Sequence, residues 1–335
     1  MSQETQPRVW LITGANSGIG LALALAVLKH GEKVIATARD LSKIPESLSE
    51  AKHVRLNLND SDETIRQVGL EALKCYGRID VLVHNAGAGL PGTVEFVSDA
   101  QLKENFQTNV FGPLSLTRAL LPSFREQKSG TVVTISSQGG MVSWPGFSTY
   151  CSTKVSFDFF MEALGAELAP YGIDSLLIQP GFIYTDWWVK ARNAGKGTKG
   201  VTNGRTGPSD EQLQVEENSG NPEGPYPHIP DLDATMTWAI GTGNCSDMDK
   251  AVERIWEFVT GNGEVGGMRM KFKEQAKEKN EGLGMVRLPL GMDCYGIYSS
   301  RVESLAANLK AYESITKSVN LTQEQLEELK KAKDA

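Results

Sequence analysis

The sequence predicts an α/β fold: a doubly wound parallel sheet with helices on both faces. Between residues 8 and 186, short β-rich runs alternate with segments of helical period, which is the pattern of βαβ units. Several of these runs are almost wholly apolar, as strands covered on both faces are. The handedness and adjacency rules for parallel strands then make a doubly wound sheet the natural arrangement.

Six strands are predicted in this region, each a run rich in apolar and β-branched residues. They are residues 8–13, 33–38, 53–58, 79–84, 131–136 and 173–178. The helical stretches that separate them are 18–30, 61–76, about 99–125 and about 148–169. We expect one domain over residues 1–335, with its core at about 8–186.

After residue 186 the pattern changes. Residues 190–232 are rich in Gly, Asn and Pro and have no periodicity, and a loop of that length is typical of a lid, which we place at about 187–245. A helical C-terminal extension is expected at about 246–335. Its helices are predicted at about 246–260, 298–317 and 323–333, the last with Thr322 as N-cap and Gln325 three residues on. MVRLPLG (285–291) is expected as an edge strand because its proline cannot donate to a ladder.

The composition is that of an ordinary globular protein, with 40% hydrophobic and 22% charged residues among 335. A net charge of −7 without blocks of like charge argues against nucleic acid as a partner. No apolar run is long enough for a transmembrane segment. The polar start has no apolar leader, and the four cysteines lack metal-ligand spacing. We therefore expect a cytoplasmic protein with reduced thiols and no metal site.

A glycine loop, TGANSGIG (13–20), follows the first strand and opens the first helix. Gly14 allows a sharp turn, Gly18 allows the backbone to approach a pyrophosphate, and Gly20 allows helix and strand to pack closely. The helix N-terminus then directs its free N–H groups at the phosphates. The loop indicates dinucleotide binding, and a tight turn without a ligand is the alternative reading of the loop alone.

Tyr150 and Lys154 are four residues apart in the helix predicted at about 148–169, so they lie on one face of it. A phenol is a poor acid–base group at pH 7, but a nearby ammonium favours the phenolate and lowers the phenol pKa. We therefore expect Tyr150 to transfer protons with the help of Lys154.

Further motifs follow the glycine loop in a fixed order. They are NAG (85–87) after the fourth strand, NVFG (109–112) in the long helix, Ser136 and Ser137 at the end of the fifth strand, Tyr150 with Lys154, and PG (180–181) followed by Thr185. Together they resemble the classical short-chain dehydrogenase/reductase family over residues 8–186. RLPLG and the helix after it look like the C-terminal region of some longer members.

The resemblance implies a Rossmann-type fold that transfers hydride between the nicotinamide C4 and a carbonyl or carbinol carbon. It implies that Tyr150 protonates the substrate oxygen in reduction, that Ser137 orients this oxygen, and that Lys154 binds the nicotinamide ribose. Ser136 is the alternative to Ser137. Asn109 would hold a water that links the lysine to solvent. Family members commonly pair through the helices at about 99–125 and 148–169, so a homodimer or homotetramer is expected; the alternative is that the apolar C-terminal tail covers that face.

The resemblance also implies a set of cofactor-binding positions. They are Gly14, Asn16, Ser17, Gly18, Ile19, Gly20, Arg39, Asn57, Leu58, Asn85, Ala86, Gly87, Tyr150, Lys154, Pro180, Gly181, Ile183 and Thr185. NADP is favoured over NAD because Ala38 stands where an acid would bind the ribose 2′-OH, and the following Arg39 suits a 2′-phosphate. Asp40 is expected as an N-cap. Asn57 replaces the family's usual Asp near the adenine, although its amide oxygen accepts the same bond.

Large side chains stand close to the expected site. Met141, Trp144 and Phe147 lie between Ser137 and Tyr150, while Trp187 and Trp188 follow Thr185. Both segments border the crevice beyond the strand ends, so the rings predict a bulky, lipophilic ketone or alcohol as substrate. Packing of the lid on the core explains the same rings.

An NADP(H)-dependent oxidoreductase, a carbonyl reductase or secondary alcohol dehydrogenase, is therefore the expected function. Two alternatives remain. One is a natural-product enzyme of the same fold that performs epimerisation or cyclisation. The other is a non-catalytic NADP-binding scaffold, which the presence of both Tyr150 and Lys154 disfavours.

Overall fold

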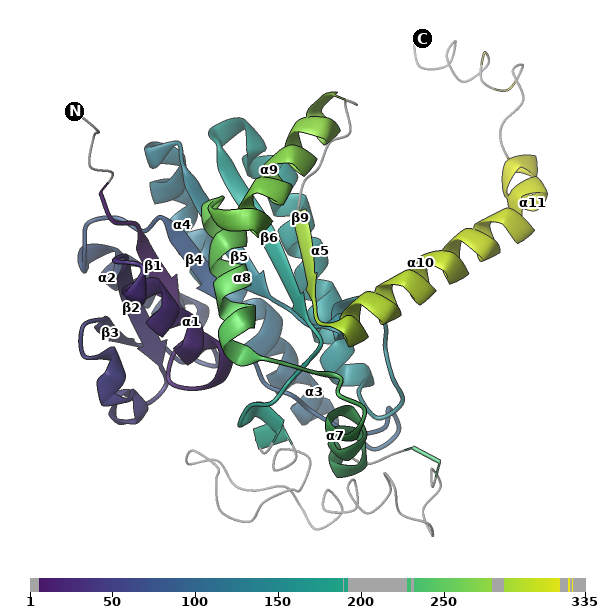
Figure 1. Ribbon diagram of the computed structural model, residues 1–335, viewed down its shortest axis with the longest axis horizontal. Helices are drawn as coiled ribbons and strands as arrows, with labels where there is room; N and C mark the ends of the chain where they lie inside the picture. Colours follow the sequence, from purple (N-terminus) through teal and green to yellow (C-terminus); the bar gives the residue numbers. More distant parts are fainter. Residues whose placement is uncertain are drawn as a thin grey trace.

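The computed structural model describes residues 6–188, 190–191, 228–229, 232–278, 286–319, 325 and 327. Within these residues the centre is a seven-stranded sheet in the order β3-β2-β1-β4-β5-β6-β9, with every pair of neighbours parallel (Figure 1). The predicted doubly wound sheet is confirmed. Its strands are β1 Val9–Ile12, β2 Lys33–Ala38, β3 Lys52–Arg55, β4 Val81–His84, β5 Gly130–Ile135, β6 Ile173–Pro180 and β9 Val286–Leu290.

Helices cover both faces of the sheet (Figure 1). In chain order they are α1 Gly18–Lys29, α2 Asp62–Lys74, α3 Asp99–Phe106, α4 Gly112–Gln127, α5 Ser148–Leu168, α7 Leu232–Gly241, α8 Met248–Thr260, α9 Gly263–Glu278, α10 Met292–Ala311 and α11 Glu313–Ser318. One apolar core joins the sheet to α2, α4 and α5, and a second joins it to α1 and α8. Since both faces are covered, every residue of β1 and β4 is buried.

The long helix predicted at about 99–125 is interrupted. Helix α3 begins with a capping box between Ser98 and Gln101 and ends at Phe106, and a π-helical turn, Gln107–Phe111, leads into α4. Such turns are frequent at functional sites, and Asn109 lies in this one. At Gly112 an added Cβ would overlap the Leu58 carbonyl oxygen, so only glycine allows α4 to start this close to the loop after β3.

The C-terminal part confirms some expectations and corrects others. β9 pairs with β6 and is the predicted edge strand, and α8 matches the helix predicted at about 246–260. The start predicted at residue 298 for the next helix is wrong, because α10 begins at Met292. Asp293 lies in its first turn, where a carboxylate is stabilised by the helix dipole. Helices α7 and α9 and the short pair β7 Phe182–Ile183 and β8 Cys245–Ser246 were not predicted.

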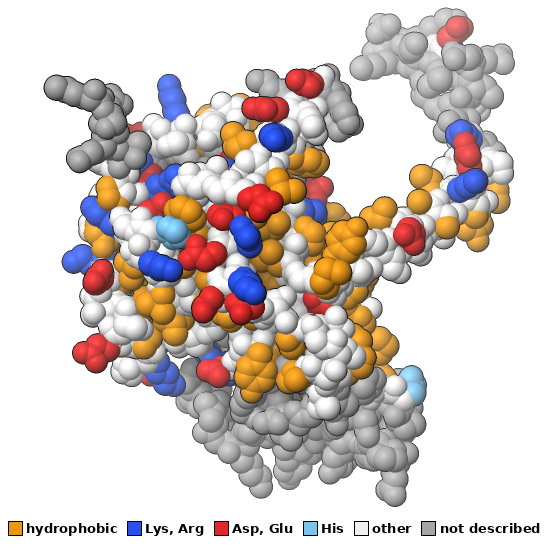
Figure 2. Space-filling model, in the orientation of Figure 1, with side chains coloured by type: hydrophobic (Ala, Val, Ile, Leu, Met, Phe, Trp, Pro, Cys, Tyr) orange, Lys and Arg blue, Asp and Glu red, His pale blue; other side chains and the backbone are white. Residues whose placement is uncertain are grey.

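Most of the lid expected at about 187–245 lies outside the described residues, as does the helix expected at about 323–333 apart from residues 325 and 327. The last part of the expected lid segment forms α7. Helix α10 packs against β9 at its start and then extends away from the body, with exposed apolar side chains along it (Figures 1 and 2). None of the described helices has the length and apolar character needed to cross a membrane.

Candidate active site

A cavity of about 1810 Å³ lies beyond the carboxyl ends of the central strands. This is the edge at which open α/β sheets bind their ligands. Most of the residues proposed from the sequence line it: Gly14, Asn16, Ser17, Gly18, Ile19, Arg39, Asn57, Leu58, Asn85, Ala86, Gly87, Ser137, Trp144, Phe147, Tyr150, Lys154, Pro180, Gly181, Ile183, Thr185, Trp187 and Trp188. Gly20, Asn109 and Met141 are not among the lining residues.

The glycine loop presents the start of α1 to this cavity. Gly14 and Gly18 have φ values of +67° and +58°, a left-handed conformation that favours glycine. Ser17 is the N-cap of α1, and within the described chain its side chain makes no capping hydrogen bond. The first turn of α1 contains no acidic residue. Its N–H groups and the positive end of the helix dipole are therefore available to an anion.

The NAG segment is hydrogen-bonded to the glycine loop. Asn85 Nδ2 donates to the carbonyl oxygens of Thr13 (2.8 Å) and Gly14 (3.2 Å), and Thr13 Oγ1 accepts the Asn85 backbone N–H (2.9 Å). A Cβ added to Gly20 would overlap Asn85 Nδ2. Gly20 does not line the cavity, but its missing side chain leaves the space that the Asn85 amide needs to bind the loop.

The loop fits a dinucleotide diphosphate on two observations. Gly18 lies opposite Thr185. A Cβ built on Gly18 would be 3.7 Å from the threonine side chain. Lys190 reaches over the loop, and its Nζ donates to Ser17 Oγ at 2.9 Å. Free N–H groups and an ammonium are the donors that phosphates require. Lys190 was not predicted as a site residue, and its position shortly after the PG–Thr185 segment was the only available signal.

The cavity extends to the ends of β2 and β3. Arg39 is exposed there and has no ion pair within the described part of the chain. Asp40 caps the turn Leu41–Lys43, accepting the Ser42 N–H at 3.0 Å, so its predicted role as an N-cap is confirmed. Asn57 donates to Asp60 (2.7 Å), and its amide oxygen accepts the Asn59 N–H at 3.3 Å.

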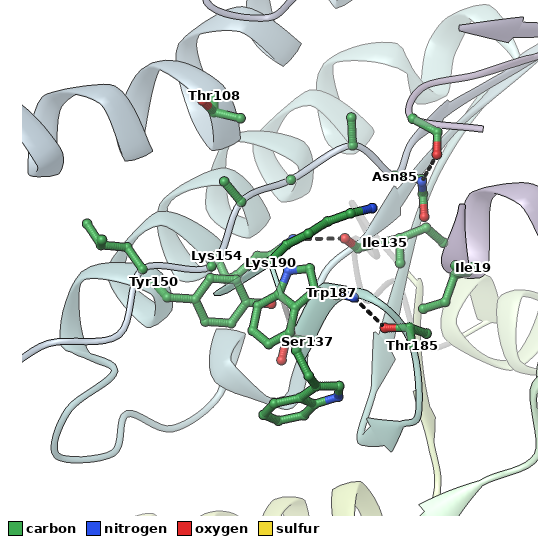
Figure 3. Close-up of a pocket in the computed structure, with 18 of the residues that line it drawn as sticks. Ile19, Asn85, Thr108, Ile135, Ser137, Tyr150, Lys154, Thr185, Trp187 and Lys190 are labelled. Carbon is green, nitrogen blue, oxygen red and sulfur yellow. Dashed lines mark hydrogen bonds between the residues drawn. The ribbon is translucent and has the colours of Figure 1, made fainter. Parts of the chain in front are cut away.

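Ser137, Tyr150 and Lys154 meet where β5 ends beside α5 (Figure 3). Lys154 Nζ donates to the Ile135 carbonyl oxygen at 3.1 Å and lies 5.6 Å from the centre of the Tyr150 ring. Tyr150 is 9% exposed. Ser137 is the second residue after β5, and its Oγ accepts the Gly139 N–H at 3.1 Å. A helix and a strand end thus bring a hydroxyl, a phenol and an ammonium to one wall of the cavity.

Burial dominates the titration of the two ionisable groups. It raises the pKa of Tyr150 well above its usual value, and the hydrogen-bonding hydroxyl of Ser137 lowers this pKa by less. Burial also lowers the pKa of Lys154 to about 8. The expectation of a lowered phenol pKa is therefore wrong for these side chains by themselves, because desolvation is the largest influence on Tyr150 and raises its pKa. A phenol that stays protonated at pH 7 suits a proton donor.

The two serines at the end of β5 differ in what they contact. Ser136 is buried, and its Oγ donates to Asp158 Oδ2 at 3.0 Å. Ser137 is the hydroxyl that interacts with Tyr150. The geometry thus favours Ser137 over Ser136 as the group that faces a substrate oxygen.

Both polar atoms of the Asn109 side chain are hydrogen-bonded to protein groups. Its Oδ1 accepts the Ala88 N–H at 2.8 Å, and its Nδ2 donates to the Ala88 carbonyl (2.8 Å) and to Thr153 Oγ1 (2.9 Å). The side chain therefore ties the segment after β4 to α5. The water expected from the resemblance is a prediction that these bonds do not test.

Aromatic rings line the part of the cavity next to Tyr150. The Trp187 ring centre lies 5.2 Å from that of Tyr150, and the Trp188 ring stacks on Phe182 at 5.3 Å. Trp238 on α7 and Ile297 on α10 also line this end and were not predicted, because they come from helices far along the chain. No group of three or more metal-ligating side chains occurs among the residues described, and all four cysteines are free thiols.

Comparisons with known proteins agree with this geometry. The family model for short chain dehydrogenase matches residues 8–196. The oxidoreductase claN of Passalora fulva is 42% identical over 176 residues, covering 51% of this chain and 80% of that protein. A short-chain dehydrogenase from Streptomyces avermitilis superposes with a TM-score of 0.69 at 31% identity, over 96% of this chain and 100% of that one. The structure of ElxO with NADP bound gives a TM-score of 0.53 at 29% identity, over 57% and 79%.

Proposed function

Because the chain belongs to the short-chain dehydrogenase family, we propose that it is an NADP(H)-dependent oxidoreductase that reduces a bulky lipophilic ketone or oxidises the corresponding secondary alcohol. The observation that carries this proposal is the meeting of Ser137, Tyr150 and Lys154 on one wall of a cavity whose other wall is the glycine loop. Each residue type in this set has a distinct chemical task.

The bound nicotinamide would supply the hydride, or accept it in the oxidative direction. Tyr150 gives its proton to the substrate oxygen as the hydride arrives at the carbonyl carbon. The hydroxyl of Ser137 donates a hydrogen bond to the same oxygen and stabilises the charge that develops on it. Lys154 would bind the ribose and keep a positive charge beside the phenolate form of Tyr150. The N–H groups of α1 and the ammonium of Lys190 would hold the diphosphate.

The preference for NADP rests on Arg39. Its guanidinium is free of ion pairs within the described residues and lies at the end of β2, where the adenosine ribose is expected. The related ElxO was solved with NADP bound, which supports a nicotinamide cofactor for this chain.

Replacement of Arg39 by Ala is expected to weaken NADP binding about tenfold to a hundredfold. A hydrogen bond to a charged group contributes about 1.5–3 kcal/mol, and NAD lacks the phosphate that Arg39 would bind. Fluorescence titration with each nucleotide measures both dissociation constants, and Arg301→Ala on the exposed part of α10 is the matched control. Equal losses for NAD and NADP would show that Arg39 does not read the phosphate.

The lipophilic substrate rests on Trp144, Phe147, Trp187 and Trp188, which line the cavity near Tyr150. The test is oxidation of NADPH with a panel of ketones that runs from acetone and sugars to polycyclic and long-chain compounds. We expect turnover of the large apolar members. Conversion of a substrate without net NADPH consumption would indicate epimerisation or cyclisation, and NADPH binding without turnover of any compound would indicate a scaffold.

A homodimer or homotetramer is part of the same proposal. Phe111, Phe159 and Phe160 are exposed on the π-helical turn and on α5, Phe159 to 63%. Apolar rings on neighbouring helices favour association of two copies on this face. Light scattering of the purified chain measures the mass directly.

A further inference from the structure

The face of helix α5 that bears Tyr150 and Lys154 carries a third ionisable side chain, one turn further along the helix. Tyr150, Lys154 and Asp158 are spaced by four residues, so the three side chains follow one another on the same face of the helix. Asp158 is 1% exposed. A buried carboxylate is costly unless it is paired or hydrogen-bonded, so its position two turns below the phenol requires an explanation.

Within the part of the chain that the structure describes, only one of the two oxygens of this carboxylate accepts hydrogen bonds, and both donors are neutral groups. Its Oδ2 accepts from Ser136 Oγ (3.0 Å) and Gln179 Nε2 (3.1 Å). Its Oδ1 is buried and has no hydrogen-bond partner among the described residues. A Cβ added to Gly140 would overlap Oδ2, so the carboxylate occupies space that any other residue at position 140 would fill.

The nearest arginine is mainly engaged elsewhere. Arg287 on β9 places Nη1 4.0 Å from Asp158 Oδ2, but its Nη2 binds the carboxylate of Glu162. The other cation that acts on Asp158 is Lys154, one turn nearer the cavity on the same helix; among the described side chains it makes no ion pair within 4.0 Å of the carboxylate, so its effect is a longer-range electrostatic one. The influence is mutual, since the carboxylate also favours the charged form of the lysine.

We propose that Asp158 is a positioning residue whose carboxylate supplies the buried counter-charge that keeps the ammonium of Lys154 protonated beside Tyr150. This inference rests on the proposed function for the use of Lys154 in catalysis. It does not rest on that function for the charge coupling itself, which is a property of the two side chains.

The titration of the two groups fits this role. Burial raises the pKa of Asp158 to about 6 and lowers that of Lys154 to about 8, so both are ionised between these values. Loss of the negative charge would remove a contribution that raises the lysine pKa. The lysine would then lose its proton at a lower pH.

The other ionisable groups around the carboxylate are Arg287, Glu162, Tyr150, Cys151, Tyr298 and Cys294. Burial raises the pKa of both tyrosines and both cysteines, so these four stay protonated. A guanidinium remains charged at every pH of interest, and Glu162 is bound to it.

The test is Asp158→Asn, which keeps the shape of the side chain and removes its charge. In protein labelled with 13Cε-lysine, the Lys154 signal is assigned by its absence in Lys154→Met, and its titration midpoint is read by NMR. We expect the midpoint to fall by about one pH unit, as for an opposite charge in the vicinity. The fall in kcat/KM with rising pH should move equally, giving about a tenfold lower value than wild type at pH 9 and one within twofold at pH 6.

Gln179→Met is the matched control, because it removes a hydrogen bond to Asp158 and leaves the carboxylate charged. Its Lys154 midpoint should stay at the wild-type value. An unchanged midpoint in Asp158→Asn, or the same shift in both variants, would overturn the inference. If the midpoint shifts in Asp158→Asn and the wild-type protein reduces no ketone, the inference about Asp158 is sustained and the proposed function is refuted.

Wild-type protein offers a second measurement should Asp158→Asn fail to fold. A lysine coupled to a carboxylate titrates with a small additional inflection where the carboxylate gains its proton, here near pH 6. We expect this inflection in the Lys154 signal, and a single-step titration would contradict the coupling.

Discussion

Replacement of Tyr150 by Phe is expected to lower kcat/KM about a thousandfold, or about 4 kcal/mol in transition-state stabilisation. Only the hydroxyl is removed, so the ring keeps its place beside Trp187 and the side chain stays buried. The loss arises because Tyr150 is the group assigned to protonate the substrate oxygen, while Ser136 is bonded to Asp158 and Lys154 donates to the Ile135 carbonyl. Steady-state kinetics on the best ketone of the panel measures the effect.

Nucleotide affinity separates a lost proton donor from a damaged site. In Tyr150→Phe the dissociation constant for NADP should stay within a few-fold of wild type, since the diphosphate and adenosine ends of the cavity are untouched. Tyr171→Phe, on an exposed tyrosine in the turn after α5, is the control and should be neutral. Retention of more than about a tenth of wild-type kcat/KM by Tyr150→Phe, a loss under about 1.4 kcal/mol, would rule out the assigned role.

The core of the fold could be predicted because its strands are buried on both faces. β1 and β4 are nearly continuous apolar runs, which signal their own burial. Helix α9 could not, because it starts in the glycine-rich GEVGG and has little apolar periodicity, so its helical state depends on packing against α8. The early start of α10 likewise depends on a tertiary contact, the hydrogen bond from the Phe182 N–H to Asp293.

Much of the candidate site could be predicted because its residues come in ordered motifs whose spacing survives in the chain. Lys190 and the network around Asp158 could not, since Asp158 meets Gln179 and Arg287 from strands far along the sequence. The direction of the Tyr150 pKa was also beyond sequence reasoning. A neighbour at i+4 can be read from spacing, but the desolvation that raises the Tyr150 pKa depends on the whole fold.

The same dependence on distant partners makes Asn109 a residue on which stability should depend. Asn109→Leu is expected to lower the free energy of unfolding by about 2–4 kcal/mol. The substitution leaves the Ala88 N–H without its partner, at about 1–3 kcal/mol. It also removes one of two bonds at the Ala88 carbonyl, which Asn105 still binds, and one of two at the Thr153 hydroxyl, which still donates to the Tyr150 carbonyl; each lost bond contributes about 0.5–1.5 kcal/mol. At about 2–4 °C per kcal/mol, Tm should fall by roughly 5–10 °C.

Calorimetry on the variant and on Asn308→Leu, an exposed position of α10, gives the comparison. The surface variant should shift Tm by less than about 1 °C, since surface substitutions rarely exceed 0.5 kcal/mol. A similarly small shift for Asn109→Leu would mean that Ala88 finds other partners and that the π-helical turn is not held by this side chain. Because kcat can be measured at 10 °C, where the weakened fold persists, a loss of turnover there would reflect the proton relay expected from the resemblance and not the loss of folded protein.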